Sequence, residues 1–415
     1  MLNAEQIVWC HGARPEYALD EVPHGDELYI PARAIPAVRP GQDLILLPGA
    51  RREVREFARF ACATLGLSAD QFFWTSGRHF VLDDDVLELL PELGAWLGEP
   101  GRWLAVPYSV TESLTHWTTK LGIPVYADTE VFSRQFGHKG ILHPAQDGYG
   151  ESLPRDLGIP VARGYLCRGV AELLSACHIL RDSIPRRGVI LKPTLGSAGE
   201  GIVHEPAADL LENYDFRLGP VVLEELLPVD SWPDGSEISV SVQTLGDQLM
   251  SGVTDQLVAR DEWIGNRVPS RTPRSFQAQV IRATQQVLGW LHVRGLRGPG
   301  GFDFLSVAGE PVLVDVNIGR FTGAHIPKIF RERYAPGMEF IAWKFRPSDA
   351  IGVFDLWQRL RSAGLAFLPG QSTNGVFPLC WLPGIWGMFI AIGRSQEEIL
   401  GLRRATSEIG FQGAT

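Results

Sequence analysis

Cysteine is scarce in this chain, and so are long apolar runs. The cysteines are odd in number and form no C-x-x-C pair, so the sequence predicts neither a disulfide framework nor a zinc site; they stand at positions 10, 62, 167, 177 and 380. The one long apolar run, Val376 to Ile392, contains prolines and glycines that would disrupt a membrane-spanning helix. This run therefore predicts two buried strands or a packed loop.

A secretory signal is also missing from the first residues. The segment M-L-N-A-E-Q-I-V-W lacks the basic stretch and the apolar core of such a signal. Because nothing in the cysteine pattern requires an oxidising compartment, we expect a cytoplasmic protein without a membrane partner.

Basic residues are fewer than acidic ones, 38 against 48. The formal net charge of −10 and the pI near 5.5 argue against a nucleic-acid partner bound through its phosphates. An anionic ligand would therefore have to be held by local cations. Lysine is rare beside arginine, so Lys139 and Lys192 draw attention, although a surface position by chance is the alternative.

The length of 415 residues predicts two to four domains with buried cores. In residues 1–130 apolar strands alternate with amphipathic helices, which predicts a parallel sheet flanked by helices. The strands are expected at Asp43–Leu47, Arg102–Val106 and Ile123–Tyr126, and the helices at Arg51–Leu65 and Val110–Leu121.

The rest of the chain predicts α+β structure in three further parts. We expect a small lobe at 131–215, a large strand-rich lobe at 216–340 and a small C-terminal subdomain at 341–415. Helices are expected at Val170–Arg181, Phe276–Leu291, Phe354–Ala363 and Gln396–Ile409.

The most informative segment is V-I-L-K-P-T-L-G-S-A-G-E-G, from Val189 to Gly201. A β-branched strand carries Lys192 into a loop with flexible backbone N–H donors, which suits the polyphosphate of a nucleoside triphosphate. The spacing matches neither a dinucleotide-binding turn nor a P-loop, and a plain hairpin turn is the alternative. The loop residues expected to contact the nucleotide are Gly196, Ser197, Ala198, Gly199 and Gly201.

A second segment, F-D-F-L-S-V-A-G-E-P-V-L-V-D-V-N from Phe302 to Asn317, predicts a β-hairpin. Asp303, Asp315 and Asn317 lie inside its apolar strands, where an unpaired carboxylate is costly to bury. A hard cation would offset that cost, and ligands that are all oxygen suit Mg²⁺. The alternative is that the acids cap strand ends or pair with arginines.

Strand pairing sharpens the metal prediction. Antiparallel partners share a face of the sheet when their residue numbers add to a constant, so the three oxygen ligands meet only if the turn has an odd number of residues. We therefore expect a three-residue turn with Gly309 in the left-handed conformation. A two-residue turn would separate the ligands.

Glutamates between these two segments predict an adenosine slot. In V-V-L-E-E-L-L a strand delivers Glu224 and Glu225, and backbone groups from Glu225 to Leu227 would pair with the adenine edge. The carboxylate of Glu237, at the head of the next strand, would bind the ribose hydroxyls. The alternative is a solvated pair of glutamates at a strand end.

Taken in order, these features resemble the ATP-grasp superfamily over about residues 131–330; they are Lys139, Lys192-Pro193, the glycine loop, Glu224-Glu225, Glu237, Asp303, Asp315-x-Asn317 and Arg320. The flanking regions, including the tail N-G-V-F-P-L-C-W-L-P-G-I-W-G-M-F-I-A-I-G, are similar to those of pheganomycin-type peptide ligases. The resemblance implies an α/β and α+β protein: a Rossmann-like pre-ATP-grasp domain, a two-lobed ATP-grasp fold and a small C-terminal α+β piece.

The activity implied by the resemblance is that of a carboxylate–amine ligase that uses ATP and Mg²⁺. It would join amino acids through an acyl phosphate and release ADP and phosphate. Lys139 and Lys192 would hold the α- and β-phosphates, and Arg320 would stabilise the developing charge, with a structural salt bridge as its alternative. The sequence departs from the family at Asp315, where a glutamate is usual, so bridging of two metals is in question.

Substrate recognition is predicted from a basic, turn-rich loop at Gly265–Arg274 that could close over the site. Arg267 or Arg271 would clamp the carboxylate of an amino acid, with simple solvation as the alternative. Two other functions stay open. One is a nucleotide-binding regulatory protein without turnover, and the other is an enzyme that stops at the phosphorylated product. A homodimer is also left open.

Overall fold

The N-terminal third forms a parallel sheet in the computed structural model, which describes residues 6–11, 29–49, 51–75, 90–108, 110, 112–143, 153–184, 188–194, 201–259, 262–345, 351–384 and 386–409. Its order is β3-β2-β1-β4, with strands β1 (Gln6–Cys10), β2 (Leu44–Pro48), β3 (Phe72–Thr75) and β4 (Trp103–Pro107). Helices α1 (Tyr29–Ala32), α2 (Arg52–Leu65), α4 (Leu90–Leu97) and α5 (Glu112–Leu121) connect or follow these strands. The predicted parallel sheet is confirmed, although the strand expected at Ile123–Tyr126 is reduced to a bridge between Val125 and Ala105.

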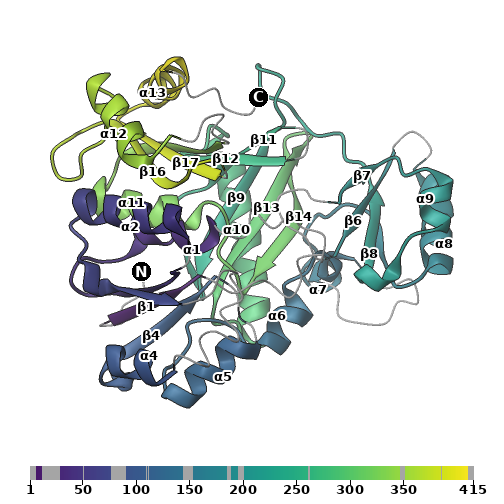
Figure 1. The fold of residues 1–415 in the computed structure, drawn as a ribbon. Helices are drawn as coiled ribbons and strands as arrows, with labels where there is room; N and C mark the ends of the chain where they lie inside the picture. Colours follow the sequence, from purple (N-terminus) through teal and green to yellow (C-terminus); the bar gives the residue numbers. More distant parts are fainter. Residues whose placement is uncertain are drawn as a thin grey trace.

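A small antiparallel sheet forms the lobe that projects at the right of Figure 1. Its order is β5-β8-β6-β7, with strands β5 (Gly164–Cys167), β6 (Val189–Pro193), β7 (Val203–His204) and β8 (Val221–Glu225). Helices α8 (Val170–Ser183) and α9 (Ala208–Glu212) cover one side, and the buried face of α8 packs on β6 and β8. Strand β8 lies beyond the expected lobe boundary at residue 215. Helices α6 (Glu130–Phe136) and α7 (Leu153–Leu157) lead into this lobe.

A nine-stranded sheet spans the centre of the molecule. Its order is β14-β13-β9-β11-β12-β15-β17-β16, with β10 paired to β9; the strands are β9 (Ser239–Leu245), β10 (Gln248–Leu249), β11 (Thr254–Ala259), β12 (Glu262–Val268), β13 (Pro299–Val307), β14 (Glu310–Ile318), β15 (Glu339–Phe345), β16 (Gly375–Leu382) and β17 (Trp386–Gly393). Helices α10 (Arg274–His292), α11 (His325–Tyr334), α12 (Val353–Ser362) and α13 (Gln396–Glu408) pack around it. All strand pairs in this sheet are antiparallel.

The apolar run near the C-terminus forms the two buried strands β16 and β17. They extend the large sheet, so the C-terminal segment has no sheet of its own among the described residues. Phe60 of α2 packs edge-on against Trp357, and its ring centroid lies 5.7 Å from that of Phe377 in β16. One apolar core therefore joins the N-terminal domain to the C-terminal segment.

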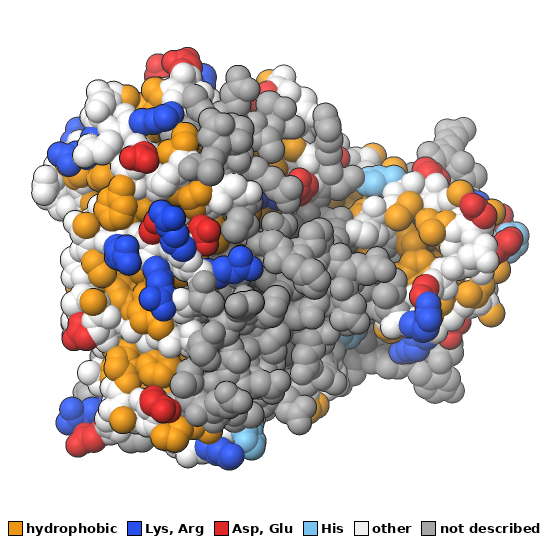
Figure 2. All heavy atoms as spheres, in the orientation of Figure 1, with side chains coloured by type: hydrophobic (Ala, Val, Ile, Leu, Met, Phe, Trp, Pro, Cys, Tyr) orange, Lys and Arg blue, Asp and Glu red, His pale blue; other side chains and the backbone are white. Residues whose placement is uncertain are grey.

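The visible surface carries charges of both signs. On the face shown in Figure 2, basic side chains lie among acidic ones over the described residues. No helix in the described ranges is both long and apolar enough to cross a membrane.

Lys328 of α11 is buried, and its ammonium donates to the carbonyl of Gly252 at 3.0 Å. Burial first, and then the charge of Arg331, lower the pKa of Lys328 from its ordinary 10.5 to about 7. Between these pH values the unfolded chain binds one more proton than the folded chain, so folding stability should rise with pH across this window.

Replacing Lys328 by methionine is expected to remove this cost. At pH 7 the free energy of unfolding should increase by about 1 kcal/mol or more, and its rise toward pH 10 should become shallower. Urea unfolding at pH 7 and pH 9 measures both effects, with exposed Lys120→Met as the matched control. A large loss of stability in Lys328→Met would show that the ammonium has a structural role.

Candidate active site

The hairpin β13–β14 places Asp303 directly opposite Asp315. Its turn has two residues, Ala308 and Gly309, both with positive φ (52° and 81°), so the predicted three-residue turn is wrong. The ligands still meet, because the register shifts by one next to Asp303 and leaves Val314 without a partner. This β-bulge puts the three side chains on one face of the sheet, as a turn with an odd number of residues would have done.

The carboxylates of the hairpin gather on one face with an amide and two cations. The Asn317 side-chain amide donates to Asp303 at 3.2 Å, and the guanidinium of Arg320 donates to the amide oxygen of Asn317. The ammonium of Lys139 lies 3.8 Å from Asp315. Asp303, Asp315, Asn317, Arg320 and Lys139 thus form the cluster that the sequence predicted.

The electrostatics of this cluster suit a divalent cation. Burial, and then the negative charge of Asp315, raise the pKa of Asp303 to about 7, against the opposing effects of Gln256, Arg320 and Lys139. Two half-buried carboxylates that repel each other, together with one amide oxygen, are a donor set that Mg²⁺ prefers. Among the described residues no three His, Cys, Asp or Glu side chains come together as a metal site, so a cation at this cluster would have to take the amide oxygen of Asn317 as its third protein ligand.

On the small-lobe side, Lys192 is held by a buried carboxylate. Its ammonium pairs with one oxygen of Glu224, and the other oxygen lies 2.8 Å from Nε2 of His143. Burial alone would raise the pKa of Glu224, but the charges and hydrogen bonds of Lys192 and His143 outweigh it and lower the pKa to about 2. Glu224 is therefore ionised at neutral pH.

His143 was not found by sequence reasoning. It stands alone in the segment G-I-L-H, with no local pattern that marks it as functional. Close packing keeps it in place: a Cβ atom at Gly164 would lie 2.9 Å from its Nδ1 and 2.7 Å from Cβ of Glu224. Only a glycine at position 164 leaves room for this pair.

The short segment from Lys139 to His143 links the two halves of the site. It begins with a 3₁₀ helix, Lys139–Leu142, that contacts both β14 and β8. Lys139 reaches the hairpin acid Asp315, while His143 reaches Glu224. The backbone N–H of Lys139 also donates to the carbonyl of Thr194, two residues after Lys192, at 3.3 Å. Both lysines thus lie at the junction of the two lobes.

The structure describes only some of the residues that were predicted to contact the nucleotide. The backbone N–H of Leu227 has no hydrogen-bond partner among the described residues, while Glu225 is buried and accepts from the N–H of Arg163 at 3.0 Å. Glu237 is exposed next to β9 and forms a backbone bridge with Ser231. Gly201 takes up a positive φ of 71° beside Pro193. The loop residues Gly196, Ser197, Ala198 and Gly199 lie outside the described residues.

A row of polar side chains continues the site across the sheet. Asp303 pairs with Ser241, and Ser241 with Thr254, so all three share one face. Ser239 donates to Gln256 at 2.7 Å, and Thr254 donates to Gln243 at 3.0 Å. The alternation in S-V-S-V-Q is the signal for this row in the sequence.

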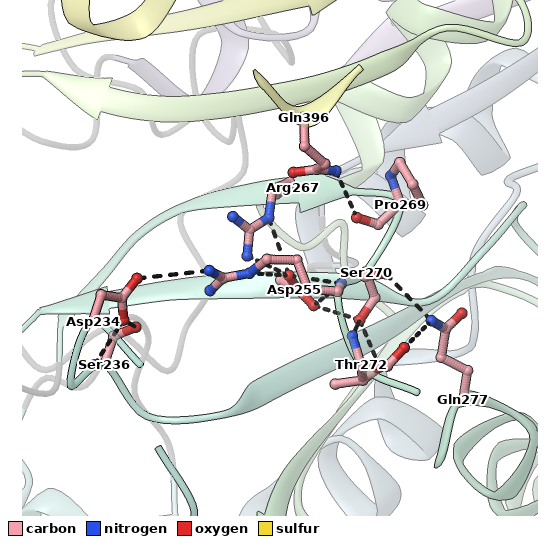
Figure 3. Close-up of polar contacts among 10 residues, drawn as sticks. Asp234, Ser236, Asp255, Arg267, Pro269, Ser270, Thr272, Gln277 and Gln396 are labelled. Atoms are coloured by element: carbon pink, nitrogen blue, oxygen red, sulfur yellow. Dashed lines mark hydrogen bonds and ion pairs between the residues drawn. The ribbon is translucent and has the colours of Figure 1, made fainter. Parts of the chain in front are cut away.

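Arg267 lies on the opposite face of the sheet from the acids. It pairs across the strands with Asp255, which neighbours Thr254 and so points the other way. Figure 3 shows its guanidinium directed at Asp255, with Nε and Nη2 at 3.1 and 2.5 Å from one carboxylate oxygen. Residues 265–268 belong to strand β12 (Glu262–Val268), so the loop prediction is wrong for the first four residues, while 269–273 do connect β12 to α10.

Arg271 belongs to the same group of residues. Its Nε lies 3.5 Å from Asp255, its Nη1 lies 3.6 Å from Asp234, and its guanidinium is 4.0 Å from the ring centroid of Trp232. The carboxylate of Asp255 also accepts from Ser270 (Figure 3). It accepts from the backbone N–H of Arg271 as well. The geometry therefore ties both arginines to Asp255, and it does not support a substrate clamp at Arg267.

The three sheets of the molecule together define a known class of fold. Residues 178–324 match the family model of the ATP-grasp domain. No curated protein matches the sequence. The parallel N-terminal sheet, the small lobe and the large antiparallel sheet together form the ATP-grasp fold.

Solved structures with the same fold align along nearly the whole chain. The biotin carboxylase domain of 2-oxoglutarate carboxylase from Hydrogenobacter thermophilus has a TM-score of 0.60 at 14% identity, covering 99% of this chain and 90% of that one. Biotin carboxylase from Campylobacter jejuni has a TM-score of 0.59 at 12% identity, covering 97% and 91%. Carboxyaminoimidazole ribonucleotide synthase from Aspergillus clavatus has a TM-score of 0.55 at 12% identity, covering 99% and 100%. At such identities the likeness establishes the fold alone.

Proposed function

We propose that this protein is an ATP-dependent ligase that joins a carboxylate to an amine. The observation that carries the proposal is the junction built by residues 139–143. It brings the acid pair Asp303–Asp315 and the pair Lys192–Glu224 to the two sides of one short segment. A site with paired carboxylates for Mg²⁺ and separate lysines for phosphate oxygens suits phosphoryl transfer.

In the proposed reaction, a carboxylate oxygen of the substrate attacks the γ-phosphorus of ATP. The new bond makes an acyl phosphate, and the bond from phosphorus to the bridging oxygen breaks to leave ADP. An amine then attacks the acyl carbon, phosphate departs, and the amine loses a proton to solvent. The amide forms without a nucleophile from the protein.

The residues have distinct roles in this proposal. Lys139 and Lys192 hold the α- and β-phosphates, while Asp303, Asp315 and Asn317 hold Mg²⁺, which neutralises phosphate charge when bound. Arg320 donates to Asn317 and stabilises the charge that develops on the transferred group. The backbone at Leu227 binds the adenine edge, and Glu237 binds the ribose. All of this is positioning and charge neutralisation.

We further propose that both substrates are amino acids and that the product contributes to a specialised metabolite. The likeness of the flanking regions to pheganomycin-type peptide ligases supports this choice. The neighbours solved with ATP, or with MgADP and bicarbonate, support a nucleotide site in the same fold. Bicarbonate therefore belongs in any test of the carboxylate substrate.

One assay tests the proposal. The protein is incubated with MgATP and mixtures of amino acids, with and without bicarbonate, and ADP, phosphate and new masses are measured. An amide mass together with ADP and phosphate in equal amounts is the expected result. A stable phosphorylated product would point to a kinase, and tight ATP binding without ADP would point to a regulatory protein.

Replacing Glu224 by glutamine should weaken the hold on Lys192. Glu224 keeps the half-buried ammonium of Lys192 in place, and a hydrogen bond to a charged group contributes about 1.5–3 kcal/mol. We expect the KM for ATP to rise about tenfold or more, with a smaller change in kcat. His143→Gln, which can still donate to Glu224, should keep most of the affinity. If both variants lost stability and kcat equally, with the KM for ATP unchanged, Glu224 would have only a structural role.

A further inference from the structure

Arg33 is a buried cation that has no acidic partner among the described residues. It follows α1, and only 7% of the residue is exposed. Its Nη2 donates to the carbonyl of Phe321 at 3.3 Å, and its Nε has no hydrogen-bond partner. An uncompensated buried charge is costly, so its presence calls for an explanation.

Arg33 lies near the point at which open parallel sheets usually bind a ligand. The order β3-β2-β1-β4 reverses direction between β1 and β4, and ligands bind beyond the carboxyl ends of strands at such a point. His11 directly follows β1, and Tyr108 directly follows β4. The guanidinium of Arg33 lies 4.7 Å from the centroid of the Tyr108 ring.

A second buried side chain at this point also lacks partners. His11 is fully buried, and neither of its ring nitrogens has a hydrogen-bond partner within the described ranges. Its ring packs against Phe321 at 4.7 Å and lies 6.1 Å from that of Tyr108. Polar atoms of two side chains are thus left without partners around the same aromatic pair.

This group of buried side chains adjoins the candidate active site. Phe321 follows Arg320, and its backbone N–H donates to the carbonyl of Tyr108 at 3.0 Å. Arg33 donates to the carbonyl of Phe321, so its guanidinium contacts the backbone beside the proposed catalytic arginine. A substrate held at Arg33 would lie close to the group that reacts.

The charge of the group formed by Arg33 and His11 fits a singly charged anion. Burial lowers the pKa of His11 well below its ordinary value, and burial also lowers the pKa of the neighbouring His325 to about 3. Both imidazoles are therefore neutral at pH 7, and the cluster carries the single charge of Arg33. A planar guanidinium with neutral donors matches a carboxylate better than a doubly charged phosphate.

We propose that Arg33, with His11 beside it, binds a substrate carboxylate. This carboxylate is a different group from the one that ATP activates. This inference rests on the proposed ligase function and restricts the choice of substrate. One substrate would carry a carboxylate that does not react, as the amine-donating amino acid does. Arg33 and His11 would anchor that group while its amine points toward Arg320.

The first test is binding and needs no turnover. Thermal unfolding is followed with sodium acetate and with sodium chloride at equal ionic strength, and the ring signals of His11 are followed in protein labelled with ¹⁵N-histidine. We expect acetate to raise the unfolding midpoint, as a ligand of the folded state does, and to move the His11 signals, which a His11→Gln variant assigns. No response, or a larger response to phosphate than to acetate, would overturn the proposal.

Variants separate a binding role from a structural one. Arg33→Met should abolish the acetate response while leaving the midpoint without acetate unchanged or higher, because an uncompensated buried charge is removed. Arg33→Lys should retain part of the response, and Arg102→Met, at an exposed arginine paired with Glu99, should retain all of it. A wild-type response in Arg33→Met would contradict the assignment. ADP formation in the ligase assay tests the proposed function separately.

Discussion

Asp315→Ala is expected to abolish turnover of MgATP, with a loss of a thousandfold or more in the rate of ADP release. Asp315 stands directly opposite Asp303 and within 3.8 Å of Lys139, so its loss removes one of two carboxylates that would hold Mg²⁺. Charge neutralisation by the metal supplies much of the catalysis in phosphoryl transfer. Full activity in this variant would refute the metal assignment.

The stability of the same variant provides a second, independent readout. The charge of Asp315 is among the causes that raise the pKa of Asp303 to about 7, so the alanine variant should relieve repulsion in the metal-free protein. We expect its thermal midpoint without Mg²⁺ to stay the same or rise, while stabilisation by Mg²⁺ disappears. Asp209→Ala, on exposed α9, is the matched control and should keep activity and the response to Mg²⁺.

Arg267→Ala is expected to destabilise the protein by about 3–5 kcal/mol, because it leaves the buried Asp255 carboxylate without its main partner. The two side chains are almost fully buried, with 3% and 1% exposure, and they join β11 to β12. Urea unfolding measures the loss. Arg271→Ala should cost about 1 kcal/mol or less, because its side chain is 29% exposed.

A double variant sharpens this prediction. Arg267→Met combined with Asp255→Leu removes both charges, and it should recover most of the stability lost in Arg267→Ala. If Arg267→Ala instead kept wild-type stability and only raised the KM of an amino-acid substrate, the clamp predicted from the sequence would be right. The position of Arg267 on the opposite face from Asp303 argues against that result.

Much of the site was predictable because its residues stand out from the apolar strands in which they lie. Asp303, Asp315 and Asn317 stood out as polar side chains in apolar strands, and Lys192 stood out at the end of a β-branched run. The bulge at Val314 was not predictable, since the pairing of two strands decides where an extra residue is accommodated. His143 and Arg33 were also missed, because their significance lies in contacts with residues 81 and 288 positions away.

The sequence by itself determined the alternation of strands and helices in the N-terminal domain, the limits of the longer helices and the residue types available for metal and phosphate, because periodicity and local composition extend over ten to twenty residues. The predicted helices at α2, α8, α10, α12 and α13 formed within two residues of their expected limits. Only the tertiary structure decided which face each side chain occupies and which charges are compensated. Those properties depend on strand register and on burial, which bring together residues that are far apart in the chain.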